Sequence, residues 1–231
     1  NGVDFDVWNP ETDPEIGAHF SVRNLDGKRE CKRQLLEEFH LPVDLERPIL
    51  ANVTRLTAQK GIDLMMAVAG DILASGAYII SLGSGERQYE DFWQRLRDYA
   101  PRQVGIFRGY NENLAHKIEA GADMFMMPSR FEPCGLNQMY SLRYGTIPIV
   151  RAVGGLEDTV QNFDAVSGTG YGFKFKEFRS DKLLEKIYEA RFAYEDKTTW
   201  AKIQRNGMAV DNSWENAARN YVDLYNWTLQ N

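Results

Sequence analysis

The chain has 231 residues, of which 43% are apolar, so it is long enough to bury a substantial core without disulfide or metal staples. Its 33 Asp and Glu against 27 Lys and Arg give no broad positive field for nucleic acid or an anionic membrane surface, and its apolar runs are too short to span a bilayer. Two cysteines, Cys31 and Cys134, are too few for a disulfide framework, so we expect a soluble protein from a reducing cytoplasm.

The first part of the chain is rich in turn signals, at Asn1-Gly2, Asn9-Pro10 and Asp13-Pro14. A helical pattern follows over residues 29–39. We therefore predict that residues 1–45 form a connecting segment with a leading helix.

From Pro48 onward, short apolar runs alternate with longer helical patterns. This alternation is typical of an α/β domain in which helices cover a parallel sheet, and we place that domain at residues 46–178. The predicted strands are Ile49–Thr54, Ala77–Leu82, Val104–Phe107, Met124–Met127, Ile147–Val150 and Tyr171–Phe175.

Beyond the last predicted strand the pattern becomes wholly helical, and residues 179–231 are predicted to be helices. The last of these helices carries an apolar stripe made of Trp214, Ala218, Tyr221, Leu224 and Tyr225.

Open parallel sheets bind ligands beyond the carboxyl ends of their strands, so the loops that follow the strands are the candidates for a site. The loop after the first strand carries Arg55 and Lys60, a pair of cations that could clamp a pyrophosphate. On the loop alone, two solvated surface charges would be the better interpretation. The position at a strand end favours the phosphate role.

Three other loops give weaker signals. Gly83 and Gly85 lack the third glycine of a dinucleotide fingerprint, so a plain turn is at least as good an explanation. Tyr110 could stack on a base, although rim packing is the more common use of a single tyrosine. Gly154 and Gly155 permit close backbone approach or simply form a tight turn.

The loop after the fourth strand, residues 129–136, is the most informative. Glu132 lies just before a helix whose first free N–H groups are expected near Gly135 and Leu136. The carboxylate could bind hydroxyls and the N–H groups an anion, but an ordinary helix start explains the residues equally well. Cys134 has no histidine nearby in the sequence, so covalent cysteine chemistry is discounted.

No metal site is predicted, because the three histidines fall in unrelated segments without the spacing of metal ligands. These residues are His19, His40 and His116.

Taken together, these segments resemble the family of bacterial glycogen synthases and plant starch synthases, which are retaining glucosyltransferases with two Rossmann-like domains. The resemblance runs nearly end to end. The matching pieces are Asn1-Gly2-Val3-Asp4, Trp8-Asn9-Pro10, Arg55-Leu56-Thr57, Gln59-Lys60-Gly61, Gly109-Tyr110, Ser129 to Leu136, Arg143-Tyr144-Gly145, Gly154-Gly155-Leu156 and Asp158-Thr159.

The resemblance implies the C-terminal half of a GT-B glycosyltransferase: a Rossmann-like parallel sheet with helices on both faces, plus a C-terminal helical segment. By the same resemblance, Arg55 and Lys60 contact the pyrophosphate of ADP-glucose, Tyr110 stacks on adenine and Glu132 binds glucose hydroxyls. The remaining donor contacts would come from Cys134, Gly135, Leu136 and Asn137. No metal and no other cofactor is implied.

This sequence departs from the pattern of the family in two places. Many related glycosyltransferases carry a second glutamate eight residues after the first, and here that position is Tyr140, which leaves the ribose contact open. The resemblance also implies an acceptor domain that would precede Asn1 and is not among these 231 residues, so we expect that this chain cannot transfer glucose alone and that its last helix packs toward that domain.

The implied reaction moves glucose from ADP-glucose to the non-reducing end of an α-1,4-glucan with retention, in the bacterial cytoplasm or, for a plant protein, the plastid. Two alternatives stay open. One is a noncatalytic nucleotide-sugar or glucan-binding module, since a fold does not dictate function. The other is a GT-B enzyme that uses UDP- or GDP-sugars.

Overall fold

The computed structural model describes residues 1–230. Its centre is a parallel sheet with the strand order β3-β2-β1-β4-β5-β6. Each predicted strand is confirmed to within two residues, and the chain has the expected α/β Rossmann-like fold. The strands are β1 (Ile49–Val53), β2 (Tyr78–Gly83), β3 (Val104–Arg108), β4 (Met124–Met127), β5 (Ile147–Arg151) and β6 (Phe173–Phe175).

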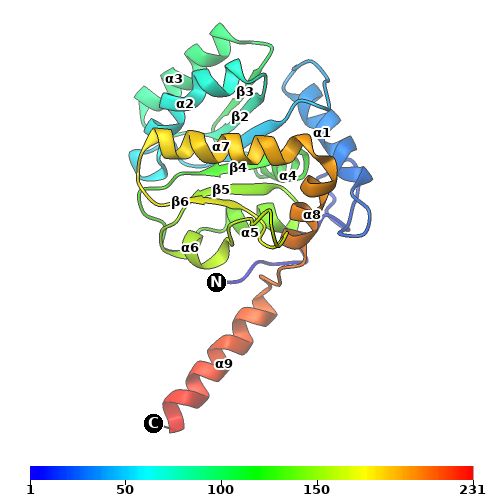
Figure 1. Ribbon diagram of the computed structural model, residues 1–231, viewed down its shortest axis with the longest axis vertical. Helices are drawn as coiled ribbons and strands as arrows, with labels where there is room; N and C mark the ends of the chain where they lie inside the picture. Colours follow the sequence, from blue (N-terminus) through cyan, green and yellow to red (C-terminus); the bar gives the residue numbers. More distant parts are fainter. Residues whose placement is uncertain (231) are drawn as a thin grey trace.

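Helices cover both faces of this sheet (Figure 1). On one face lie α2 (Ile62–Ala74), α3 (Arg87–Tyr99) and α7 (Ser180–Glu195). On the other lie α1 (Asp26–Glu38) and α4 (Glu112–Gly121). The remaining helices are η1 (Ala58–Lys60), α5 (Asn137–Arg143), α6 (Gly155–Thr159), α8 (Lys197–Met208) and α9 (Trp214–Gln230).

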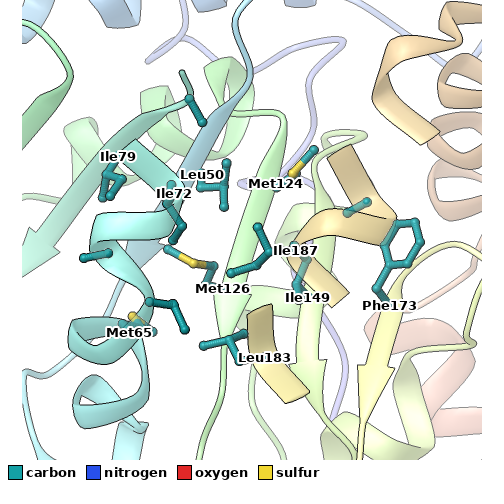
Figure 2. Close-up of a cluster of buried hydrophobic side chains, with 14 of the residues drawn as sticks. Leu50, Met65, Ile72, Ile79, Met124, Met126, Ile149, Phe173, Leu183 and Ile187 are labelled. Carbon is teal, nitrogen blue, oxygen red and sulfur yellow. The ribbon is translucent and has the colours of Figure 1, made fainter. Parts of the chain in front are cut away.

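The strands read as nearly continuous apolar runs because both of their faces are buried. In β1, Leu50 belongs to the core under α2 and α7, whereas Ile49 belongs to the core under α1 and α4. Figure 2 shows the first of these cores, where Met65 of α2 and Ile187 of α7 surround the strand side chains. Burying one such side chain fully contributes about 1.5–3 kcal/mol, so these two cores hold the strand ends in place.

The leading segment packs onto α4 and α5. The Trp8 ring is stacked between the rings of His116 and Tyr140, with centroid distances of 3.7 and 3.9 Å. Asp13 is buried, and its Oδ2 lies 2.8 Å from Nδ1 of His116 and accepts a 2.5 Å hydrogen bond from the Tyr144 hydroxyl. Burial opposes ionisation of Asp13, but these two hydrogen bonds lower its pKa. The connecting segment is thus fixed to the domain by buried contacts.

A buried polar cluster joins α1 to α4, to α5 and to Thr146, the residue before β5. The Lys28 ammonium donates to the carbonyl of Ala120 at 3.0 Å and to the Thr146 hydroxyl at 2.7 Å. Nearby, the Ser141 hydroxyl donates to the Glu119 carboxyl at 2.7 Å. Burial lowers the pKa of Lys28 to about 8 and raises the pKa of Glu119 to about 8. Both groups therefore titrate close to neutral pH.

The Glu119 pKa predicts how stability depends on pH. The folded chain keeps a proton on this carboxyl up to about pH 8, whereas the unfolded chain releases it near its ordinary pKa of 4.5. Since the native state binds more protons in this window, the free energy of unfolding should fall as pH rises from 5 to 7.5. In Glu119→Gln this fall should shrink by more than about 1.4 kcal/mol, the equivalent of one pKa unit. Urea unfolding at several pH values measures the free energy of unfolding of both proteins. The same dependence of this free energy on pH in wild type and in Glu119→Gln would contradict the raised pKa of Glu119.

The last helix, α9, projects away from the body of the domain (Figure 1). Within the described residues, no helix is long and apolar enough to cross a membrane. The apolar side chains of α9 are nevertheless exposed: Trp214, Tyr221, Val222, Leu224, Tyr225, Trp227 and Leu229.

Candidate functional site

A cavity of about 210 Å³ lies at the carboxyl ends of β1 and β4. After β1 it is lined by Arg55 and Lys60, and after β4 by Ser129 and Gly135. The two loops that the sequence singled out therefore face each other across one cavity. This is the edge at which open parallel sheets bind their ligands.

An ion pair joins Lys60, which lines the cavity, to Glu132 of the opposite loop. The Lys60 Nζ lies 2.5 Å from the Glu132 Oε2, which also accepts a 3.2 Å hydrogen bond from the Ser129 hydroxyl. The Glu132 side chain is only 8% exposed. Because a buried charge needs a partner, the ammonium and the carboxylate are held side by side. Lys60 and Ser129 line the cavity, and the Glu132 carboxylate lies directly behind them, in contact with both.

The two loops are tied together by their backbones. Gly61 has a φ of 71°, and a Cβ at this position would lie 2.0 Å from the carbonyl oxygen of Pro128, so only glycine allows this approach. The Arg130 N–H donates to the carbonyl of Gln59 at 2.8 Å, and the Arg130 guanidinium pairs with Asp63 at 2.6 Å. Lys60 and Glu132 therefore belong to one connected unit.

Gly154 and Gly155 pack closely against the backbone of the loop that carries Glu132. The Gly155 N–H donates to the carbonyl of Glu132 at 3.1 Å, and a Cβ on Gly155 would lie 2.1 Å from the carbonyl oxygen of Cys134. The sequence indicated only that backbone comes close here. The structure identifies what approaches it: the loop of the site itself.

The helix after the loop begins close to where the sequence placed it. Leu136 is the N-cap of α5, which begins at Asn137, so the free N–H groups at the helix start lie within about two residues of the predicted Gly135 and Leu136. The Asn137 amide donates to the carbonyl of Val53 at 2.7 Å. This bond joins the start of α5 to the end of β1.

The other predicted residues lie at different distances from the cavity. Leu136 and Asn137 line the cavity. Cys134 is a free, half-buried thiol that donates to the carbonyl of Gly135 at 3.0 Å. Tyr110 is 80% exposed and follows β3, two strands away from β1. Neighbouring strands lie about 4.8 Å apart, so Tyr110 is on the order of 10 Å from the cavity along the sheet edge.

Sequence reasoning missed two contributors. The hydroxyl of Ser129 reaches Glu132, and the Arg151 guanidinium binds the carbonyls of the same loop. The position of Ser129, at the start of the motif, was the available signal for the first. The sequence carried no signal for Arg151, because the carbonyls that it binds belong to residues 21 and 22 positions earlier in the chain.

Comparison with known proteins identifies the family. A model of the family described as glycosyl transferases group 1 matches residues 35–207. The chain belongs to this family. It is 49% identical over 225 residues to a glycogen synthase from Koribacter versatilis, covering 97% of this chain and 46% of that protein. A glycogen synthase from Kosmotoga olearia is 44% identical, over 99% of this chain and 48% of the relative.

A solved structure extends the likeness to three dimensions. The catalytic domain of starch synthase IV from Arabidopsis thaliana, bound to ADP and acarbose, superposes with a TM-score of 0.91 at 34% identity. The match covers all of this chain and 48% of the solved catalytic-domain chain. The resemblance to glycogen and starch synthases is thus confirmed, and the chain spans about half the length of the curated relatives it matches.

Proposed function

We propose that this glycosyltransferase chain is the donor-binding half of a glycogen or starch synthase and that its donor is ADP-glucose. The observation that carries the proposal is the Lys60–Glu132 pair, which lies beside Arg55 at the ends of β1 and β4. Arg55 and Lys60 would bind the diphosphate, and Glu132 the glucose hydroxyls. Tyr110, farther along the same edge, would stack on the adenine.

In the proposed reaction, glucose moves to the non-reducing end of an α-1,4-glucan with retention. The bond between C1 of glucose and the β-phosphate oxygen breaks, and ADP leaves with the electron pair. The acceptor hydroxyl oxygen bonds to C1 from the same face and passes its proton to the departing phosphate. Because negative charge grows on that phosphate, Arg55 and Lys60 stabilise the transition state more than the ground state, without a metal ion.

Glu132 is not the nucleophile in this scheme. A covalent mechanism would need a free carboxylate facing C1, as in retaining glycosidases. The Glu132 carboxylate is instead engaged by Lys60 and by Ser129. Isolation of a glucosyl adduct on Glu132 from the turning-over enzyme would disprove the front-face route.

We further propose that the acceptor is bound by a second domain, outside these 231 residues, and that α9 packs against it. The exposed side chains of Trp214, Tyr221, Leu224 and Tyr225, which share one stripe of α9, support this placement, since a large exposed apolar face is costly in water. In this arrangement the chain alone binds donor but does not turn over. Two unpaired cysteines fit the reducing conditions of a cytoplasm.

Reconstitution tests the proposal. The chain is joined to the upstream half of one of its glycogen synthase relatives and assayed with ADP-glucose and a glucan primer. We expect glucose incorporation by the joined protein and none by the chain alone. Incorporation from UDP-glucose in preference to ADP-glucose would overturn the donor assignment, and donor binding without any incorporation would favour a noncatalytic nucleotide-sugar module.

A further inference from the structure

Arg151, the last residue of β5, reaches across to the neighbouring loop. Its Nη1 donates to the carbonyl oxygens of Ser129 at 3.3 Å and of Arg130 at 2.5 Å. Its Nε donates to the carbonyl oxygen of Lys176 at 2.9 Å. One guanidinium therefore joins the loop after β4 to the loop after β6.

The planar shape of the guanidinium is what makes these contacts possible. Several N–H donors in a fixed fork can satisfy carbonyls on two sides at once, whereas a lysine ammonium is a single compact centre. Phe178 adds a platform, with its ring centroid 4.1 Å from the Arg130 guanidinium and 5.6 Å from that of Arg151. Arg151 is thereby fixed in one orientation.

The segment that Arg151 holds ends at Glu132. The two bound carbonyls lie only three and two residues before this carboxylate, and the Glu132 carbonyl is itself held by the Gly155 N–H at 3.1 Å. Arg151 is not among the side chains that line the cavity. Its contacts are to backbone, so it acts on the site through the loop and not by touching a ligand.

We propose that Arg151 is a positioning residue that sets the orientation of Glu132, and that it thereby governs how strongly the site prefers a nucleotide sugar over the bare nucleoside diphosphate. The inference rests on the proposed function, in which Glu132 binds the sugar and the cations Arg55 and Lys60 bind the diphosphate. Arg151 bonds to the loops after β4 and β6, whereas Arg55 and Lys60 belong to the loop after β1. Loss of Arg151 should therefore weaken the sugar contact more than the diphosphate contacts, even though Lys60 is paired with Glu132.

Calorimetric titration of the chain with ADP and with ADP-glucose tests the proposal. In Arg151→Met, the Kd for ADP should stay within about twofold of wild type, while the Kd for ADP-glucose rises about tenfold, the loss of roughly one hydrogen bond to a charged group. Glu132→Gln should show the same change in selectivity. Arg151→Lys should lie between wild type and Arg151→Met, because an ammonium can replace only part of the fork.

The matched control is Arg179→Met. Arg179 is an exposed arginine of the same region whose guanidinium pairs with Asp181, and we expect wild-type selectivity from this variant. A melting temperature recorded for each protein confirms folding. If Arg151→Met does not fold, the comparison of Arg151→Lys with wild type decides.

The contrary outcomes are distinct. Equal weakening of ADP and ADP-glucose in Arg151→Met would make Arg151 a phosphate ligand and overturn the positioning role. A second contrary outcome is that Arg151→Met keeps the wild-type preference for ADP-glucose over ADP while Glu132→Gln loses it. This pair of results would also overturn the positioning role of Arg151, but it would leave the proposed function intact. If the wild-type chain binds no ADP, or if Glu132→Gln keeps full selectivity, the proposed function fails and the role of Arg151 falls with it.

Discussion

Replacing Lys60 with alanine is expected to weaken ADP binding by about 1–3 kcal/mol, the usual range for a lost hydrogen bond to a charged group. The reason is geometric, since Lys60 lines the cavity and is held 2.5 Å from Glu132. The substitution also leaves the buried Glu132 carboxylate without its cation, so the variant should unfold at a lower temperature. Calorimetry with ADP and thermal melting measure the two effects separately.

Two comparisons control this result. Lys182→Ala removes an exposed Lys–Glu pair on α7 and should change neither affinity nor stability appreciably. Arg55→Ala removes an exposed cation from the same cavity and should weaken ADP by a similar amount while leaving the melting temperature nearly unchanged. Unchanged ADP affinity in both the Lys60 and the Arg55 variant would eliminate the diphosphate assignment.

Replacing Gly61 with alanine is the second change for which we expect a large effect. A left-handed φ costs a non-glycine residue about 1–2 kcal/mol, and the new Cβ would lie 2.0 Å from the Pro128 carbonyl oxygen. Overpacking of this kind costs a further 1–3 kcal/mol or so, giving a loss on the order of 2–5 kcal/mol in the free energy of unfolding. Because the clash is between the two loops of the site, ADP affinity should fall as well.

Gly76 offers a matched control for the Gly61 experiment. It has a φ of 85°, but a Cβ there would meet no atom within 4 Å. Gly76→Ala should therefore show only the cost of the backbone conformation, about 1–2 kcal/mol, and normal ADP binding. Equal destabilisation in the two variants, with ADP binding retained in both, would mean that contact between Gly61 and Pro128 does not hold the loops together.

The sequence was sufficient to predict the strands, for a physical reason. A strand buried on both faces, such as β1, must be apolar at every position, and short apolar runs between helical patterns are easily located. The strand order was beyond reach, because placing β1 beside β4 depends on how distant helices pack. The same argument applies to the site: the loops at the strand ends were located, but the pairing of Lys60 with Glu132 spans 72 residues.

The details that escaped prediction are those fixed by backbone contacts. The hydrogen bond from Asn137 to Val53 could not be predicted, because it joins residues 84 positions apart. The sequence indicated only that some backbone passes close to Gly155. The structure shows that this backbone is that of Cys134. The stacking role of Tyr110 stays a prediction, since its ring is exposed at the end of β3.

The most direct test of the account is calorimetric titration of the chain with ADP, UDP and GDP under identical conditions. We expect ADP to bind at one site per chain, at least about tenfold tighter than UDP or GDP, a ratio that corresponds to about 1.4 kcal/mol. No detectable heat with ADP, or equal affinities for the three nucleotides, would contradict the claim that this chain is the donor half of an ADP-glucose-dependent synthase.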